Sequence, residues 1–218
     1  MRWPYGDCVV WGLAMAETLR FYRRHLPHWL VADHTYFVTI RQKGTLPADV
    51  VKELQQEREK LLSTPHAGDD VLALLRKQFV RVERILHSPT QVGVLTNPAI
   101  ATILVENLAW LESDSRGWNV YAAVVMSTHM HIVLRNEKGR SSELLSDIGL
   151  YKSFTAREAN KVRGCKGSLW AREEFDHWCS SQESVVKAVR YVKENPVKAG
   201  LCRDWQEWPW TRVGCEWS

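Results

Sequence analysis

Long hydrophobic runs are absent from this sequence of 218 residues, because no stretch reaches the roughly 18 apolar residues of a membrane-spanning helix. Residues 1–14, MRWPYGDCVVWGLA, make a poor signal peptide, since proline, glycine and aspartate interrupt their apolar stretch. We therefore expect no membrane partner and a cytoplasmic location. Met15 follows directly, and our hypothesis is that residues 1–14 are a non-native or disordered extension translated from an upstream start.

Cysteine pairs are also absent. The five cysteines are odd in number, are scattered and form no C-x-x-C motif; they are Cys8, Cys165, Cys179, Cys202 and Cys215. A zinc knuckle needs paired cysteines, and a disulfide framework shows an even number at regular spacing. We expect neither.

Internal repeats and low-complexity linkers are missing too, so residues 15–218 are expected to form one domain. The chain is long enough to bury a core. Its hydrophobic fraction of 45% and charged fraction of 25% are typical of a folded globular protein.

Charge of one sign is concentrated in one segment, although the whole chain carries only +4. Residues 152–172 hold six basic side chains against one acid, Glu158; they are Lys152, Arg157, Lys161, Arg163, Lys166 and Arg172. Such a block suits a polyanion. The alternative is the solvated face of an ordinary helix.

Hydrophobic periodicity and turn residues predict the order of elements. Asn97 and Pro98 are expected to begin a helix, and Pro196 to close another. The predicted elements are a strand at 35–42, helices at 48–63, 71–86 and 98–111, a hairpin of strands at 118–126 and 129–135, a helix at 141–162, an extended segment at 168–178 and a helix at 182–194.

This order predicts an α+β fold, a ferredoxin-like βαββαβ sandwich with an antiparallel sheet. Extra helices follow the first strand, and a C-terminal helix comes last. We expect helices to cover one face of the sheet and to leave the other face free.

Two histidines alternate with apolar residues in the second strand of the hairpin. Met130, Ile132 and Leu134 share one face, and His129 and His131 lie on the other, which we expect to be uncovered. Neutral imidazoles suit a divalent transition metal, and Mg²⁺ or Mn²⁺ is acceptable if oxygen ligands complete the shell. The alternative is a pair of surface histidines that make ordinary hydrogen bonds.

The last predicted helix offers a third ligand and a nucleophile. Tyr191 and Asn195 are four residues apart and share one helical face. Beside the hairpin, Asn195 would supply the third ligand, and Tyr191 would point at whatever the metal binds. A packed tyrosine with a capping asparagine is the alternative, and Tyr151 is the weaker competitor for nucleophile.

Six ordered blocks between about residues 20 and 210 resemble the REP-associated tyrosine transposases, single-tyrosine relatives of the IS200/IS605 group with a histidine, hydrophobic, histidine (HUH) motif. They are FYRRHLPHW, FVTIRQKGTLP, VVMSTHMHIVL, YKSFTAREANK, SLWAREEFD and YVKENPVKAGL. By this resemblance His129, His131 and Asn195 match metal ligands and Tyr191 matches the nucleophile. The family often has proline and asparagine where this chain has Ser127 and Thr128.

The resemblance implies a metal-dependent endonuclease and strand transferase that cleaves single-stranded DNA at palindromic hairpins through a 5′-phosphotyrosine intermediate, with Mg²⁺ or Mn²⁺ as cofactor. We expect a monomer or homodimer associated with the nucleoid. Phosphate contacts are expected from Lys152, Arg157, Lys161, Arg163 and Arg172. The alternatives are a phosphodiesterase that uses water and a DNA-hairpin-binding module without catalytic activity.

Overall fold

The computed structural model describes residues 18–23, 27–62, 68–88, 93–172 and 174–217. The expected extension at residues 1–14 lies outside this part of the chain. The proposal of a single domain from residue 15 stays a prediction.

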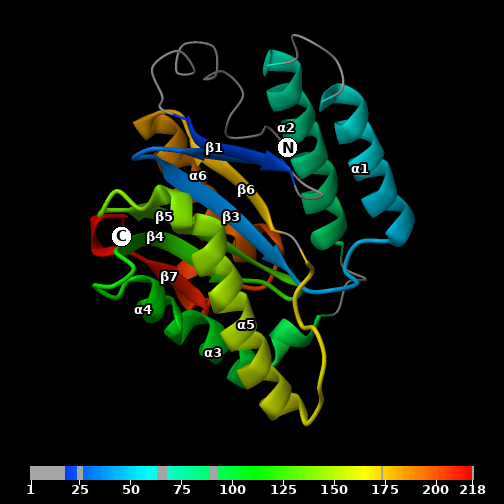
Figure 1. Cartoon of the computed structure of the whole chain (residues 1–218). Helices are drawn as coiled ribbons and strands as arrows, with labels where there is room; N and C mark the ends of the chain where they lie inside the picture. The colour runs from blue at the N-terminus through cyan, green and yellow to red at the C-terminus, as the bar shows by residue number, and fades with distance from the viewer. Residues whose placement is uncertain (1–17, 24–26, 63–67, 89–92, 173, 218) are drawn as a thin grey trace.

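The centre of the structure is a five-stranded antiparallel sheet in the order β6-β3-β5-β4-β7 (Figure 1). The strands are β3 (Thr35–Arg41), β4 (Trp118–Val125), β5 (His129–Asn136), β6 (Phe175–Cys179) and β7 (Thr211–Val213). Without the edge strand β7, the order is fourth, first, third and second along the chain, as in the predicted βαββαβ sandwich. The predicted α+β class and the hairpin of β4 and β5 are confirmed.

Helices α3 (Pro98–Glu106) and α5 (Leu144–Arg163) lie in front of the sheet in the view of Figure 1. Met130, Ile132 and Leu134 point to this side and are fully buried in the main apolar cluster. Since apolar residues at alternate strand positions share a face, the sequence pattern predicted this core correctly.

The opposite face of the sheet is covered as well, so the prediction that it is left free is wrong. Helix α6 (Gln182–Lys198) lies behind the sheet in Figure 1 and packs its valine stripe on Phe37 and Val133. Helix α2 (Gly68–Leu86) adds Phe79 to the same cluster. The histidine side of β5 is therefore interior.

Helix α2 is held from both sides. Helix α1 (Ala48–Leu62) runs beside it (Figure 1), and Nε2 of Gln78 donates to the carbonyl oxygen of Leu54 at 3.0 Å. Val82 and Leu86 of α2 are buried in a third apolar cluster. This packing fixes the last turns of α2 against the sheet.

Two helix boundaries differ from the prediction. The helix at 98–111 is interrupted at Asn107, whose side chain donates to the carbonyl oxygen of Ile103, and α4 (Leu108–Leu111) follows. Pro196 lies inside α6 and does not close it. Proline removes only its own N–H from the hydrogen bonds of the helix. The last turn continues, because the amide of Ala199 still donates to the carbonyl oxygen of Asn195. The predicted cap is confirmed: Asn97 accepts from the Ala99 amide at 3.0 Å.

A two-stranded ribbon of β1 (Thr18–Arg23) and β2 (Pro27–Val31) was not predicted, nor was β7. The hydroxyl of Tyr36 ties the ribbon to the sheet by donating to the carbonyl oxygen of Val31 at 2.6 Å. Short 3₁₀ helices are η1 (Val94–Thr96), η2 (Ser141–Glu143), η3 (Trp205–Glu207) and η4 (Cys215–Trp217). Among the helices within the described ranges, none has the length and apolar character needed to cross a membrane.

Candidate active site

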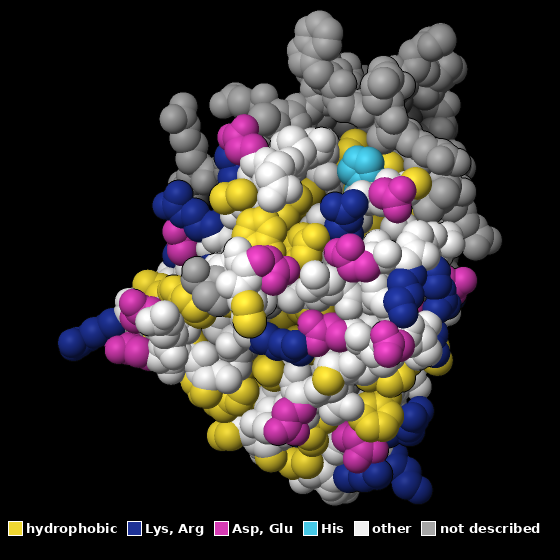
Figure 2. Space-filling model, turned by 90° about the vertical axis from the view of Figure 1, so that its left-hand side faces the viewer, with side chains coloured by type: hydrophobic (Ala, Val, Ile, Leu, Met, Phe, Trp, Pro, Cys, Tyr) yellow, Lys and Arg dark blue, Asp and Glu magenta, His cyan; other side chains and the backbone are white. Residues whose placement is uncertain are grey.

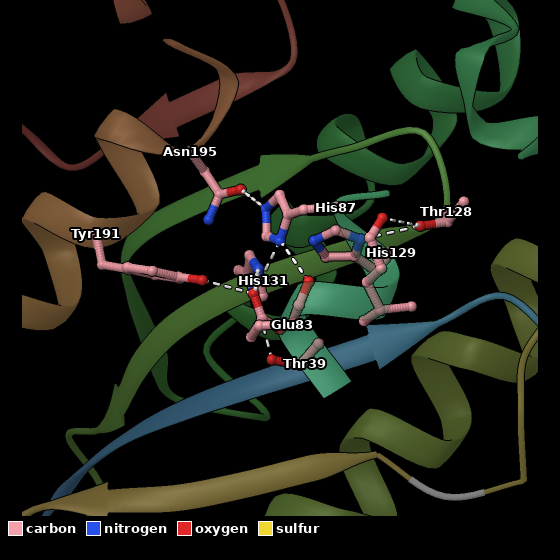
Figure 3. Close-up of polar contacts among 9 residues, drawn as sticks. Thr39, Glu83, His87, Thr128, His129, His131, Tyr191 and Asn195 are labelled. Carbon is pink, nitrogen blue, oxygen red and sulfur yellow. Dashed lines mark hydrogen bonds and ion pairs between the residues drawn. The ribbon is translucent and has the colours of Figure 1, made fainter. Parts of the chain in front are cut away.

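The two histidines of β5 lie side by side on the face covered by α2 and α6 (Figure 3). Their ring centroids are 4.6 Å apart, and His129 and His131 are 1% and 0% exposed. Nε2 of each ring is buried and makes no hydrogen bond within the described part of the chain. Two buried nitrogens thus face a shared space.

Two threonines fix the orientation of these rings through Nδ1. Oγ1 of Thr39, opposite His131 in the pairing of β3 with β5, lies 2.9 Å from Nδ1 of His131. Oγ1 of Thr128 lies 3.1 Å from Nδ1 of His129. Hydrogen bonding at one ring nitrogen leaves the other available for a metal, which is the usual arrangement of ligating histidines.

Helix α2 brings two residues that the sequence analysis missed. Glu83 and His87 join His129 and His131 in a cluster whose ligand atoms all lie within 4.8 Å of one another. Oε2 of Glu83 is 3.3 Å from Nε2 of His131 and 3.5 Å from Nδ1 of His87. The available signal was their four-residue spacing in a predicted helix, which places an acid and an imidazole on one face.

The protonation states of this cluster suit a cation. Burial alone would raise the pKa of Glu83, but the neighbouring histidines, His131 first, more than offset this and lower it to about 2. Burial, and then His131, lowers the pKa of His129 well below its ordinary value. An ionised carboxylate beside a neutral imidazole is the form in which these groups bind metal.

Orphaned polar atoms provide a direct test of whether these residues fit a metal ion. Oε1 of Glu83 and Nε2 of His129 and of His131 are buried without a hydrogen bond among the described residues. Buried polar atoms without partners are costly and rare in folded proteins. All three carry lone pairs, so a divalent cation satisfies them together.

Tyr191 reaches the same cluster from α6. Its hydroxyl donates to Oε2 of Glu83 at 2.5 Å, and its ring centroid is 5.6 Å from that of His131 (Figure 3). Burial and the negative charge of Glu83 both raise the pKa of Tyr191. The structure therefore brings the predicted nucleophile and the two predicted histidines together, with the phenol in its protonated form.

Asn195 contacts the cluster through His87. Its Oδ1 lies 2.6 Å from Nε2 of His87, and its side chain is buried one turn beyond Tyr191 on α6. Nδ1 of His87 lies 2.8 Å from the carbonyl oxygen of Glu83. The predicted third ligand is thus near the histidine pair, with an unpredicted imidazole beside it.

Tyr151, the competing tyrosine, belongs to the other side of the sheet. Its hydroxyl donates to the carbonyl oxygen of Leu104 at 2.5 Å, within the cluster under α3 and α5. Burial raises its pKa. Tyr151 therefore packs within this cluster, away from the histidine pair.

Lys152 has a different role from the predicted phosphate contact. Its ammonium is buried and donates to Oε2 of Glu174 at 2.6 Å and to the carbonyl oxygen of Arg172 at 3.1 Å. Its charge is compensated inside the protein and is not presented to solvent. Lys152 joins α5 to the segment that precedes β6.

The other predicted phosphate contacts are exposed, and the three of them on α5 lie away from the cluster. Arg157, Lys161 and Arg163 are on the second half of α5, which covers the face opposite to Tyr191, and Arg172 follows α5 along the chain. Local partners such as Glu158, 2.7 Å from Lys161, leave these side chains at the surface. Arg157, Lys161 and Arg163 therefore do not share a surface with the histidine cluster.

Comparison with known proteins gives a match at the level of the fold. No known family model and no curated protein matches the sequence. Among solved structures, the fold is similar to that of a REP-associated tyrosine transposase bound to a REP hairpin, with a TM-score of 0.50, 15% identity, and coverage of 88% of this chain and 82% of that chain. At this identity the likeness concerns the fold. The chain therefore has the fold of a REP-associated tyrosine transposase.

Proposed function

We propose that the protein is a metal-dependent endonuclease and strand transferase that acts on single-stranded DNA. The observation that carries the proposal is the convergence of the Tyr191 hydroxyl with His129, His131 and Glu83 at one buried point. The fold similarity to a hairpin-bound transposase supports it. A tyrosine placed at a metal-binding cluster suits phosphoryl transfer better than a purely structural role.

In the proposed reaction the Tyr191 oxygen attacks the scissile phosphorus, and the bond to the 3′ oxygen breaks. The products are a 5′-phosphotyrosine link and a free 3′-hydroxyl, and attack by another 3′-hydroxyl on that link joins strands. The hydrogen bond to Oε2 of Glu83 orients the Tyr191 hydroxyl, and the proton that the phenol loses is balanced by the one that the departing 3′ oxygen gains.

The resemblance implies His129, His131 and Asn195 as ligands and Mg²⁺ or Mn²⁺ as the ion. A divalent ion bound there would polarise the phosphate and stabilise the departing oxygen. Thr39 and Thr128 hold the two imidazoles in the orientation that binding requires.

We propose single-stranded DNA with palindromic hairpins as the partner, and the nucleoid as the place of action. Arg157, Lys161, Arg163 and Arg172 are proposed to contact the phosphates of a hairpin stem, at a distance from the scissile bond, because α5 covers the other sheet face. The face drawn in Figure 2 mixes basic and acidic side chains, so it is a poorer candidate for this contact. Nucleophile and histidines come from one chain, so a monomer can cleave, and a homodimer is the proposed form for exchanging two strands.

The test is incubation of the protein with a labelled hairpin oligonucleotide carrying a single-stranded flank, in Mg²⁺ or Mn²⁺. We expect an adduct that survives denaturing electrophoresis, is lost in Tyr191→Phe and is kept in the control Tyr151→Phe. Nicked DNA without adduct would support a phosphodiesterase that uses water. Hairpin binding without cleavage in either ion would support a binding module.

A further inference from the structure

We infer that Glu83 and His87 complete the metal centre, so that three imidazoles and one carboxylate bind the ion, and Asn195 acts as a positioning residue for His87. This inference rests on the proposed function and changes its ligand set. It also shifts the preferred ion from Mg²⁺ to an imidazole-binding transition ion such as Co²⁺ or Zn²⁺.

The burial of Glu83 is the first argument. Its side chain is 7% exposed in a helix held by Phe79 on the sheet and by Val82 in the third apolar cluster. A carboxylate buried in this way costs several kcal/mol unless a cation compensates it. No lysine or arginine is paired with Glu83 among the described residues, and its ion-pair neighbours are the imidazoles of His87 and His131.

The second argument is that the two carboxylate oxygens of Glu83 have different contacts. Oε2 accepts the hydrogen bond from Tyr191, whereas Oε1 is buried without a hydrogen bond in the described part of the chain. Glu83 can therefore hold the nucleophile through Oε2, the oxygen 3.3 Å from Nε2 of His131, and still offer Oε1 as a second acceptor. One side chain thereby sets the position of the phenol relative to the metal.

The geometry of His87 is the third argument. Its Nδ1 faces Oε2 of Glu83 at 3.5 Å, and its Nε2 contacts Oδ1 of Asn195 at 2.6 Å. A ligating imidazole commonly donates its other N–H to an oxygen acceptor, and Asn195 occupies that position. Binding through Nδ1 requires the ring to release its 2.8 Å contact with the Glu83 carbonyl.

Ligand chemistry then selects the ion. Imidazole nitrogen suits Zn²⁺, Co²⁺ and similar ions, whereas Mg²⁺ prefers oxygen ligands and retains several waters. A cluster with three imidazoles, two of them fully enclosed, offers Mg²⁺ one carboxylate only. We therefore expect Mg²⁺ to compete weakly for this site.

The test uses Co²⁺ as the probe with metal-free full-length protein, by calorimetry and by the visible d–d spectrum. His87→Ala and His87→Gln are expected to lower Co²⁺ affinity by about 10–100-fold and to change the spectrum. His34→Ala, which removes an imidazole outside the cluster, is the matched control and should behave as the wild type. Circular dichroism without metal verifies that each variant is folded.

Asn195→Ala distinguishes the two ligand sets. We expect it to weaken Co²⁺ binding less than the His87 variants and to leave the spectrum close to that of the wild type. The inference is overturned if the His87 variants bind Co²⁺ as the wild type does while Asn195→Ala loses binding, or if equimolar Mg²⁺ displaces Co²⁺. In either case a Tyr191-dependent DNA adduct would leave the proposed function intact, and its absence despite tight Co²⁺ binding would refute that function alone.

Discussion

The hydroxyl of Tyr191 and Oε2 of Glu83 are 2.5 Å apart, although the two residues are separated by 108 positions in the sequence. The same oxygen lies 3.3 Å from Nε2 of His131. A single carboxylate therefore joins the proposed nucleophile to the proposed metal centre, and the properties of Glu83 should govern both binding and cleavage.

Glu83→Gln is expected to lower the rate of adduct formation on the order of 100-fold, because the amide keeps the shape of the carboxylate but lacks the negative charge that would hold the ion beside Tyr191. The measurement is a single-turnover time course with hairpin DNA at saturating concentration. Glu53→Gln, on the exposed side of α1, is the control. An unchanged rate in Glu83→Gln would exclude Glu83 from the reaction.

The stability of the metal-free protein is expected to fall with acidity because of His129. Its pKa is well below 6.5 in the folded state, so below about pH 6.5 the unfolded chain takes up a proton that the folded chain does not. The free energy of unfolding should then decrease by about 1.4 kcal/mol per pH unit from this group. Glu83 contributes in the same direction at lower pH, between its unfolded value of 4.5 and its folded value of about 2.

Urea unfolding in the presence of a chelator, between about pH 7 and pH 5, measures this slope. His129→Gln should make the slope shallower, whereas His34→Gln, outside the cluster, should keep it. Equal slopes in wild type and His129→Gln would show that His129 is protonated in the folded protein.

Lys152→Met is expected to destabilise the protein by about 3–5 kcal/mol, because it leaves the buried Glu174 without its cation. The double variant Lys152→Met/Glu174→Leu should recover most of that loss, as thermal or urea unfolding will show. Hairpin affinity of the double variant should match that of the wild type. A selective loss of affinity with unchanged stability would return Lys152 to the DNA interface.

The salt dependence of hairpin binding tests the exposed basic residues of α5. Each phosphate contact to a duplex stem that is removed should reduce the slope of log affinity against log salt by about 0.9. One variant neutralises three residues of α5, which are Arg157, Lys161 and Arg163. The comparison variant neutralises three residues of α6, which are Lys187, Arg190 and Lys198. A slope that changes only in the α6 variant would place the stem on the Tyr191 side of the sheet.

Local periodicity predicted much of this molecule. Alternation in β5 placed His129 and His131 together, and the four-residue spacing in α6 placed Tyr191 and Asn195 on one face, because both relations involve neighbours within one element. The apolar clusters on the two sheet faces contain the residues that these patterns selected.

The contribution of α2 could not be predicted in the same way. Its apolar stripe indicated a helix but not which sheet face it covers, and that choice decides whether Glu83 and His87 meet the histidine pair. The pairing of His87 with Asn195 joins residues 108 positions apart, a relation that no local pattern encodes. For the same reason the covered histidine face was missed.

The long separation between α2 and α6 has a consequence during synthesis. A growing chain that has reached β5 already contains Glu83 and both strand histidines, yet it lacks the phenol until α6 has left the ribosome. Nascent or truncated chains that end before residue 191 can gather the ion-binding groups but cannot break a DNA strand through this tyrosine. The order of the elements thus places the proposed nucleophile after the ion-binding groups in synthesis.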